Sequence, residues 1–429
     1  MPMICAAALQ LPAHDYEQFD EAWATFLPLI RTAAKHARLV VLPEGTAPAY
    51  VLTTAGDNGR ATAHALDDLA TIARETDTTF VIGAARTDQG HLYNSAFVVD
   101  NDGSVAGYAD KFCLWHFDER WYRRGERIAP ISTSLGLLGV LICADGRIPA
   151  IARSLRAQGA NALVMPTAWV TSNRRDDDLE NLQADLLAQT RALENNIPLI
   201  AANKCGVERG TVKYCGKSQI VDAGGSCLAL ASQTTPEILY AEIALEHVQP
   251  FPFASASFVH SRSNLEVQTF RLAVHVGAPI PVHETCTMLD IDALLSTSTV
   301  PSEYSQHRHI SSIDIDDARA RDPIGCVEAR LAGVHLFVWH LRSLEESAAL
   351  RIARTRAAEL RCYFALFSAH ERAWIIDPNG ALLCSADSDY HVAVATVTPE
   401  ILCSGIVAPH TDVLEELTRA MAVSGHHAR

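Results

Sequence analysis

The sequence predicts an α/β protein built on mixed β-sheets, with helices packed outside the sheets. Apolar runs of strand length alternate with segments of helical spacing, and short hairpin turns interrupt this alternation. The composition, 48% hydrophobic and 20% charged residues, is typical of a globular protein. A chain of 429 residues is too long for one ordinary core, so we expect two domains.

The elements of the first quarter follow in order. Residues 17–37 carry apolar side chains at helical spacing and lead into an apolar strand at residues 39–42. Residues 66–74 repeat the helical pattern before a strand at residues 79–84. Residues 94–99 form a further strand, and the Asp-Asn-Asp-Gly that follows predicts a hairpin turn.

The next elements keep the alternation. Residues 138–142 predict a buried strand that stops at the polar turn Ala-Asp-Gly-Arg. A short helix is expected at residues 149–158 and another strand at residues 162–166. The stretch Pro-Phe-Pro-Phe-Ala-Ser-Ala-Ser at residues 250–257 indicates a linker. We therefore expect one domain over residues 1–255 and a second over residues 256–429.

Three reactive side chains each follow a predicted strand, which for the second of them is a strand-like segment at residues 103–108. They are Glu44 in Leu-Pro-Glu-Gly, Lys111 in Asp-Lys-Phe-Cys, and Cys143 in Leu-Ile-Cys-Ala-Asp. A single strand-end cysteine is more often a small buried hydrophobe, and a single charge beside a turn is usually solvated. The three together indicate chemistry.

Their order, glutamate, lysine and then cysteine, resembles the nitrilase (carbon–nitrogen hydrolase) superfamily, whose triad stands at these motifs. The resemblance covers roughly residues 3–246 and includes Pro166-Thr-Ala-Trp169, residues 189–195, Ala202-Asn203 and residues 216–225. It implies a four-layer α-β-β-α sandwich. It also implies a hydrolase, independent of metal or organic cofactor, that cleaves the amide or carbamoyl C–N bond of a small molecule.

The chemistry of such a bond suits these residue types. An amide carbon is a poor electrophile, and a covalent intermediate on Cys143 divides one difficult step into two. A free thiol has a pKa near 8.5, so Cys143 needs a base, for which Glu44 is the candidate. Lys111 and the backbone N–H of Ala144 are the candidates for stabilising the oxyanion.

A second acid is expected close to Lys111. Glu119 lies in Glu-Arg-Trp-Tyr, which resembles the element that follows the lysine in aliphatic amidases of this superfamily, where the acid orients lysine and substrate. Asp118 is the alternative. In carbamoylases the equivalent acid lies one residue earlier in the chain, and so one residue further from the glycine that ends this motif. We favour Glu119.

Residues near Cys143 narrow the range of substrates that we expect. Nitrilases proper usually carry Trp-Glu after the cysteine, whereas Ala144-Asp145 resembles the amidase and carbamoylase branches. Arg147 either binds a substrate carboxylate, as an arginine does there in some carbamoylases, or pairs with a local acid such as Asp145. Three aromatic side chains are expected to line the substrate pocket or to belong to the core: Trp115, His116 and Trp169.

The C-terminal region repeats parts of the first domain. Residues 317–323 align without gaps to residues 143–149, and two later segments, 355–359 and 374–380, match 190–194 and 219–225. We interpret this region as a degenerate copy of the second half of the catalytic domain. Asp317 stands at the nucleophile's place, so a second active site is not expected.

The copy also suggests how the chain assembles. Superfamily members usually dimerise through the helix after the nucleophile and the helix that bears Arg-Ala-Leu-Glu. The copy retains helical spacing at residues 323–331 and 349–360, the counterparts of both helices. We therefore expect a pseudo-dimer in cis, with further homo-oligomerisation left open.

Charge and cysteine content exclude several classes of protein. A net charge of −15 argues against partners such as nucleic acid or anionic membranes. No apolar run approaches the ~20 residues that span a bilayer, and the N-terminus lacks a basic leader. The 11 cysteines are scattered without a CxxC, which indicates neither a zinc site nor a disulfide framework and favours a cytoplasmic location. Residues 260–310 stay unassigned, and the His-Arg-His at 307–309 is interpreted as a loop or as weak metal ligands.

Three alternatives compete with hydrolysis. Residues 210–218 resemble a nucleotide-binding phosphate loop, but five residues separate the glycines where four are needed, and a strand is predicted where a helix should follow. The same triad could pass the acyl group to an amine, and the sequence leaves this open. A non-catalytic scaffold is disfavoured because Glu44, Lys111 and Cys143 are all present.

Overall fold

A computed structural model describes residues 3–52, 58–171, 179–253, 270–277, 293–296, 312–398, 402 and 404–426. The chain divides into two compact units, Met1–Phe253 with Ala420–Arg429, and Ala254–Arg419. We call them the N-terminal unit and the C-terminal unit. Glu44, Lys111 and Cys143 all belong to the N-terminal unit. The His-Arg-His at 307–309 lies outside the described residues.

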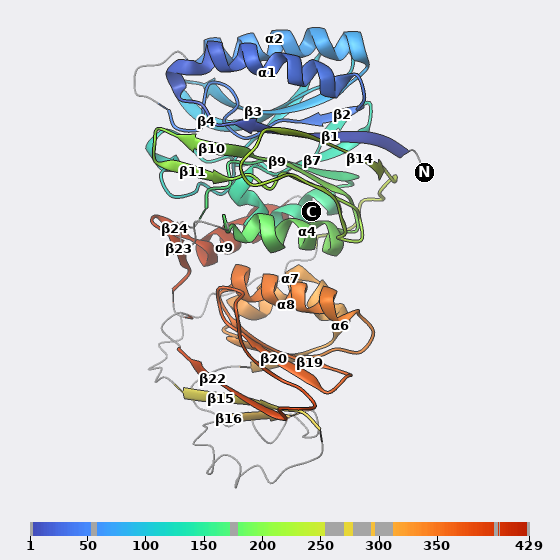
Figure 1. The fold of residues 1–429 in the computed structure, drawn as a ribbon, viewed down its shortest axis with the longest axis vertical. Helices are drawn as coiled ribbons and strands as arrows, with labels where there is room; N and C mark the ends of the chain where they lie inside the picture. The colour runs from blue at the N-terminus through green and yellow to red at the C-terminus, as the bar shows by residue number, and fades with distance from the viewer. Residues whose placement is uncertain are drawn as a thin grey trace. The chain divides into compact units, whose positions relative to one another are not determined.

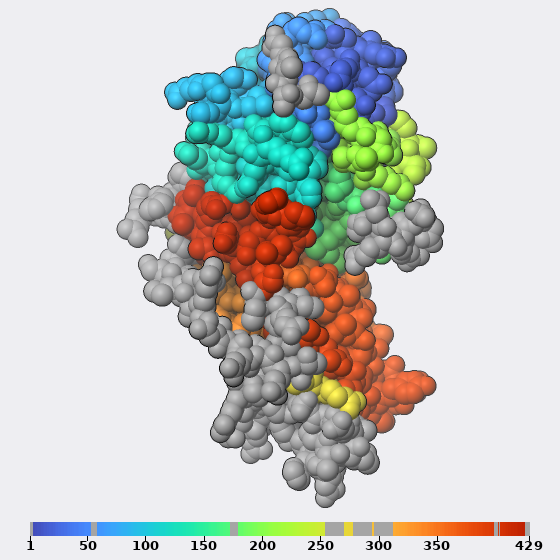
Figure 2. Space-filling view, turned by 90° about the vertical axis from the view of Figure 1, so that its left-hand side faces the viewer, coloured from blue at the N-terminus to red at the C-terminus, as the bar shows by residue number. Residues whose placement is uncertain are grey.

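The first sheet of the N-terminal unit has the strand order β11-β10-β1-β2-β3-β4-β5, and β14 also pairs with β1. Its strands are β1 (Met3–Pro12), β2 (Leu39–Val41), β3 (Thr79–Asp88), β4 (His91–Val99), β5 (Val105–Asp110), β10 (Lys204–Glu208), β11 (Val212–Cys215) and β14 (Glu237–Ala244). The pairs β1–β2 and β2–β3 are parallel, and the hairpins that follow β3 are antiparallel. In Figure 2 the green to yellow-green segments lie beside the blue N-terminal segment, as the pairing of β1 with β10 and β14 requires.

The second sheet has the order β13-β12-β9-β8-β7-β6. Its strands are β6 (Ile131–Thr133), β7 (Gly136–Val140), β8 (Ala162–Pro166), β9 (Leu199–Ala202), β12 (Gln219–Val221) and β13 (Cys227–Leu230). The strands β7, β8 and β9 are parallel neighbours. Strand β12 stands directly after Ser218, where a phosphate loop needs a helix, so the nucleotide-binding alternative lacks its structural context.

Helices cover the outer faces of both sheets (Figure 1). The first sheet carries α1 (Phe19–Ala34) and α2 (Asn58–Thr76), whose buried Trp23, Phe26 and Leu69 pack against it. The second sheet carries α3 (Pro149–Ala157) and α4 (Ala188–Asn195). Shorter helical segments are η1 (Tyr16–Gln18), η2 (Asp118–Arg120), η3 (Cys143–Arg147) and the π-helical η4 (Gln183–Leu187). The N-terminal unit is therefore the expected four-layer α-β-β-α sandwich.

The C-terminal unit contains two further sheets and a layer of helices. One sheet has the order β16-β15-β22, and the other has the order β17-β18-β19-β20-β21. The strands are β15 (Phe270–His275), β16 (Ala293–Ser296), β17 (Ser312–Ile315), β18 (Leu336–His340), β19 (Tyr363–Ser368), β20 (Arg372–Ile376), β21 (Leu382–Ala386) and β22 (Val392–Val397). The helices are α6 (Asp317–Arg321), α7 (Pro323–Leu331) and α8 (Glu346–Leu360). Buried apolar side chains of β15, β18, β19, β20 and β22 form the core between the sheets.

The chain ends with the two-stranded sheet of β23 (Ile406–Ala408) and β24 (Thr411–Asp412), followed by α9 (Val413–His426). Within the described ranges, every helix is too short or too polar to cross a membrane.

Candidate active site

The three reactive side chains meet inside the N-terminal unit, although two come from one sheet and the third from the other. Glu44 follows β2, Lys111 follows β5, and Cys143 follows β7. Their exposed fractions are 0%, 1% and 5%. The amino group of Lys111 donates a 2.8 Å hydrogen bond to Oε1 of Glu44, and the backbone N–H of Glu44 donates to the carbonyl of Thr167 beyond β8 at 3.2 Å. The active-site edges of both sheets are thereby joined.

Lys111 lies between two carboxylates. Its Nζ donates to Oε1 of Glu44 at 2.8 Å and to Oδ2 of Asp118 at 2.6 Å. Burial alone would lower the pKa of Lys111, but the charges of Asp118 and Glu44 outweigh burial and raise it well above its usual value. An ammonium group has three N–H donors, and the described contacts occupy two of them, so one remains for a substrate oxygen.

The two oxygens of Glu44 differ in their contacts. Oε1 accepts from Lys111 and from the side-chain amide of Asn94 at 2.7 Å. Oε2 is buried, and no hydrogen-bond partner for it occurs in the described part of the chain. Burial raises the pKa of Glu44 against the opposing charge of Lys111, and the charge of Asp118 adds to the rise. One oxygen is therefore fixed while the other is open to exchange a proton.

Cys143 begins the 3₁₀ turn η3 in the left-handed region, with φ 46°. Non-glycine residues in this region are uncommon and cluster at functional sites. Burial raises the pKa of the thiol well above its usual value, and the charge of Glu44 raises it further. The thiol is therefore protonated near neutral pH and needs a base to become a nucleophile.

Asp145 holds the turn that begins at Cys143 against the loop after Lys111. Its Oδ2 accepts from the backbone N–H of Ile142 at 3.0 Å, and its Oδ1 accepts from those of Phe112 and Cys113 at 3.1 and 2.7 Å. Residues on both sides of the site are thus tied to one carboxylate. From the sequence, Asp145 was expected to mark the amidase and carbamoylase branches and was considered as a partner for Arg147.

The acid that contacts Lys111 is Asp118. The prediction that Glu119 is this acid was wrong by one residue. Asp118 is fully buried, and its carboxylate also accepts from the hydroxyl of Tyr50 at 3.0 Å and the backbone N–H of Trp115 at 2.9 Å. The Glu119 side chain is 52% exposed, and its Oε1 lies 3.6 Å from Nη2 of Arg124. The turn η2 directs consecutive side chains in different directions, and only Asp118 points toward the lysine.

The remaining predicted residues lie in the segments that follow β5, β7 and β8. Arg147 stacks its guanidinium over the ring of Trp115, 4.4 Å from the centroid, and Ala144 is fully buried. His116 contacts Phe117 edge to face at 5.2 Å. Trp169 is 1% exposed, and the structure describes no hydrogen-bond partner for its indole N–H.

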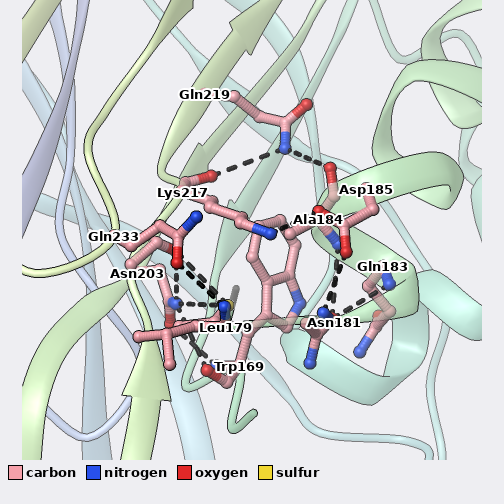
Figure 3. A network of polar contacts seen from close by, with 12 residues as sticks. Trp169, Leu179, Asn181, Gln183, Ala184, Asp185, Asn203, Lys217, Gln219 and Gln233 are labelled. Atoms are coloured by element: carbon pink, nitrogen blue, oxygen red, sulfur yellow. Dashed lines mark hydrogen bonds and ion pairs between the residues drawn. The ribbon is translucent and has the colours of Figure 1, made fainter. Parts of the chain in front are cut away.

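A polar network fixes the segment that carries Trp169 (Figure 3). Oδ1 of Asn203 accepts from the backbone N–H of Trp169 at 2.7 Å, and its Nδ2 donates to the carbonyl of Gly216 at 2.7 Å. Further along, Nζ of Lys217 donates to Oδ1 of Asp185 at 2.8 Å, and Nε2 of Gln219 donates to the carbonyl of Ala184 at 2.8 Å. Several motifs that resembled the superfamily therefore meet in one network beside the second sheet.

Sequence reasoning missed two supporting residues, Asn94 and Tyr50, and it missed the anchoring role of Asp145. Asn94 had a weak signal, since it is a polar residue at the start of an apolar strand. Gly83 is also required here, because a Cβ at that position would approach the Cα of Glu44 to 2.4 Å.

The residues that the structure describes include neither a metal-binding cluster nor a disulfide bond. Within those ranges, no cluster of three or more His, Cys, Asp or Glu side chains is arranged to hold a metal ion. The cysteines described there are free thiols.

Comparison with known proteins relates the chain to one family. A sequence model of the carbon-nitrogen hydrolase family matches residues 5–253. A nitrilase from Pyrococcus abyssi is 32% identical over 238 residues, which cover 53% of this chain and 84% of that protein. A deaminated glutathione amidase from Escherichia coli O157:H7 is 30% identical over 182 residues, 41% of this chain and 64% of that protein.

The matches to several curated relatives span only 41% to 64% of their length. Among solved structures, a carbon-nitrogen hydrolase from Helicobacter pylori G27 matches with a TM-score of 0.51 at 28% identity. That match covers 57% of this chain and 90% of the other chain.

Proposed function

The chain belongs to the carbon-nitrogen hydrolase family, and we propose that it hydrolyses small linear amides or carbamoyl compounds through an acyl-enzyme on Cys143. Glu44 acts as the base, Lys111 stabilises the oxyanion, and Asp118 orients Lys111. The observation that carries this proposal is the asymmetry of Glu44. Its Oε1 is held by Lys111 and Asn94, while Oε2 has no hydrogen-bond partner among the residues that the structure describes.

In the first half of the reaction, Glu44 removes the thiol proton of Cys143 as Sγ attacks the carbonyl carbon. The carbonyl π electrons move onto oxygen, where the third N–H of Lys111 and the backbone N–H of Ala144 stabilise the charge. Collapse of this intermediate breaks the C–N bond, and the leaving amine takes the proton from Glu44. The product of this half is a thioester on Cys143.

In the second half, Glu44 takes a proton from water, and the resulting hydroxide equivalent attacks the thioester carbon. The second tetrahedral intermediate expels the Cys143 thiolate, which recovers its proton from Glu44. The chain ends in its starting protonation state and has released an acid and an amine. Burial of Glu44 supports this double role, since it raises the pKa of the carboxyl and so makes the group a better proton acceptor than an exposed glutamate.

The substrate class rests on the sequence around the nucleophile and on the named relatives. Ala144-Asp145 replaces the Trp-Glu of nitrilases proper, and one relative is named an amidase. A relative from Oryza sativa subsp. japonica, 27% identical over 191 residues, is named an N-carbamoylputrescine amidase. Another relative is named a nitrilase, so nitriles are the comparison to make.

The test uses matched pairs in which each amide has the same carbon skeleton as its nitrile, together with the corresponding ureido compounds. We expect ammonia release from amides or ureido compounds and no release from the nitriles. Faster release from a nitrile than from its own amide would contradict the proposed substrate class. Cys143→Ala serves as the control for contaminating activity.

A further inference from the structure

We propose that the C-terminal unit is a reduced second copy of the N-terminal unit, and that its former active-site edge now binds a small zwitterion of the amino-acid class. This inference goes beyond the hydrolytic function and does not depend on it.

The five-stranded sheet of the C-terminal unit repeats the topology of the nucleophile-bearing sheet. In the N-terminal unit, β7, β8 and β9 are parallel neighbours, and β12 and β13 continue the sheet as antiparallel strands. In the C-terminal unit, β17, β18 and β19 are parallel, and β20 and β21 continue antiparallel. Helices α3 and α4 make the parallel connections in one unit, and α7 and α8 make them in the other.

The other sheet of the C-terminal unit matches the first sheet of the N-terminal unit in part. Strand β1 pairs parallel with β2 and antiparallel with β14, which follows the β12–β13 hairpin. Strand β15 pairs parallel with β16 and antiparallel with β22, which follows the β20–β21 hairpin. The copy therefore extends beyond the second half of the domain that the sequence suggested.

Local details that topology does not dictate also recur. Helix α4 carries a fully buried pair three residues apart, Arg191 and Glu194, and α8 carries the same pair as Arg356 and Glu359. A buried ion pair is costly to desolvate and is rarely placed by chance. Its presence at the same turn of the corresponding helix supports common ancestry of the two units.

The β12–β13 hairpin of the N-terminal unit and the β20–β21 hairpin of the C-terminal unit also match closely. The turn after β12 closes with the N–H of Gly225 donating to the carbonyl of Asp222 at 3.0 Å, and Gly225 has φ 81°. The turn after β20 closes with Gly380 donating to Asp377 at 2.9 Å, and Gly380 has φ 79°. Both hairpins carry a register shift in the last pairs before the turn.

The residue at the nucleophile's place has become a structural anchor. Asp317 follows β17 as Cys143 follows β7, and its carboxylate accepts from Ser343 N–H at 2.6 Å, Ser343 Oγ at 2.7 Å and Trp339 Nε1 at 2.9 Å. Burial would raise the pKa of Asp317, but these hydrogen bonds lower it to about 2. These hydrogen bonds occupy the carboxylate of Asp317 and fix the loop that follows β18.

That loop forms one side of a cavity of about 570 Å³, which is within the ~300–1,000 Å³ range of small-molecule sites. The cavity is lined by residues 341–346, 368–370 and 372, at the carboxyl ends of β18 and β19. Ligands of α/β sheets bind at these ends. The corresponding ends of β8 and β9 lead into Trp169 and Asn203 of the active-site network.

The charges of this cavity identify the ligand class. Glu346 is neutralised within the cavity, since it pairs with Arg372 and accepts from Ser368 Oγ at 2.8 Å. Arg342 and Glu345 also line it, both are exposed, and neither forms an ion pair in the described part of the chain. The carboxylate of Glu345 accepts from the hydroxyl of Ser347 through Oε2, which leaves Oε1 for a ligand. One cation and one anion therefore remain for a ligand that carries a carboxylate and an ammonium group. Leu341, Leu344 and Ala369 provide apolar contact for its side chain.

The test measures binding rather than turnover, and uses the full chain with Cys143→Ala so that no probe is consumed. Probes are the standard amino acids, screened by ligand-observed saturation-transfer NMR and followed by calorimetry. We expect at least one amino acid to bind, and its matched amine and matched carboxylic acid to bind at least about tenfold more weakly, as loss of a charge-assisted hydrogen bond predicts.

Three charge variants in the same background locate the site. Arg342→Gln and Glu345→Gln should each weaken binding about tenfold or more. Arg321→Gln, an exposed cation outside the cavity, is the matched control and should leave binding unchanged. The proposal is overturned if no amino acid binds at millimolar concentration, or if binding persists unchanged in Arg342→Gln.

Discussion

Asp118 accepts a 2.6 Å hydrogen bond from Lys111 at Oδ2, and both side chains are withdrawn from solvent. A buried ammonium needs compensating charge, and Lys111 obtains it from Asp118 and Glu44 together. Tyr50 and the backbone of Trp115 complete the hydrogen bonds of Asp118. Lys111 is thereby kept charged and fixed, as its proposed role in stabilising an oxyanion requires.

Asp118 and its neighbour Glu119 give a matched pair of variants. Asp118→Asn should lower kcat/KM about 10²-fold or more, because Lys111 loses a charged partner and its position. Glu119→Gln should leave kcat/KM within about twofold, since its side chain is on the surface. Steady-state kinetics of both variants on one amide substrate tests which of the two acids supports Lys111. Equal losses in both variants would contradict the assignment of the second acid.

Glu44 should act as a unit with Cys143. Glu44→Gln keeps the shape and the hydrogen bond to Lys111 but removes the base, so we expect a loss of about 10²–10⁴-fold in kcat. The double variant Glu44→Gln with Cys143→Ala should be no worse than Cys143→Ala alone. Additive losses would show that the two groups act independently. Circular dichroism and thermal unfolding control for folding of each variant.

Buried His14 should make stability depend on pH. Its Nε2 lies 2.7 Å from the carbonyl oxygen of Pro48, and burial together with the charge of Lys204 lowers the pKa of His14 from 6.5 to about 4. The folded state therefore prefers the neutral ring. The contribution of His14 to the free energy of unfolding is complete above pH 6.5. It falls as the pH drops toward 4, by roughly 3 kcal/mol in all.

His14→Gln tests this dependence, since glutamine can still donate to the Pro48 carbonyl but does not titrate. Urea unfolding followed by tryptophan fluorescence, at several pH values between 7 and 4, should show a shallower loss of stability in the variant. The same slope in both proteins would mean that other groups set the acid sensitivity.

The sequence predicted the strands and helices around the candidate site well, because strand ends are marked by abrupt changes from apolar to polar residues. The expected strand at 162–166 coincides with β8 (Ala162–Pro166), and the expected helix at 149–158 is α3 to within one residue. The segment 17–37 is shorter as a helix, because Tyr16–Gln18 form a separate 3₁₀ turn before α1.

What the sequence could not give was the direction of side chains in irregular turns. Asp118 and Glu119 are adjacent, and only the backbone of η2 determines which one faces Lys111. The role of Asp145 depends on amides of residues 112 and 113, more than 30 positions away in the chain. Neither relationship leaves a periodic signal in the sequence.

The most direct test of the central claim is mass spectrometry of the protein quenched during turnover of an amide. Peptide mapping should locate an acyl group on Cys143, with a mass equal to that of the substrate after loss of its amine. Glu44→Gln should slow formation of this adduct, and Cys143→Ala should abolish it. Sustained turnover by Cys143→Ala, or an acyl group on another residue alone, would contradict the account.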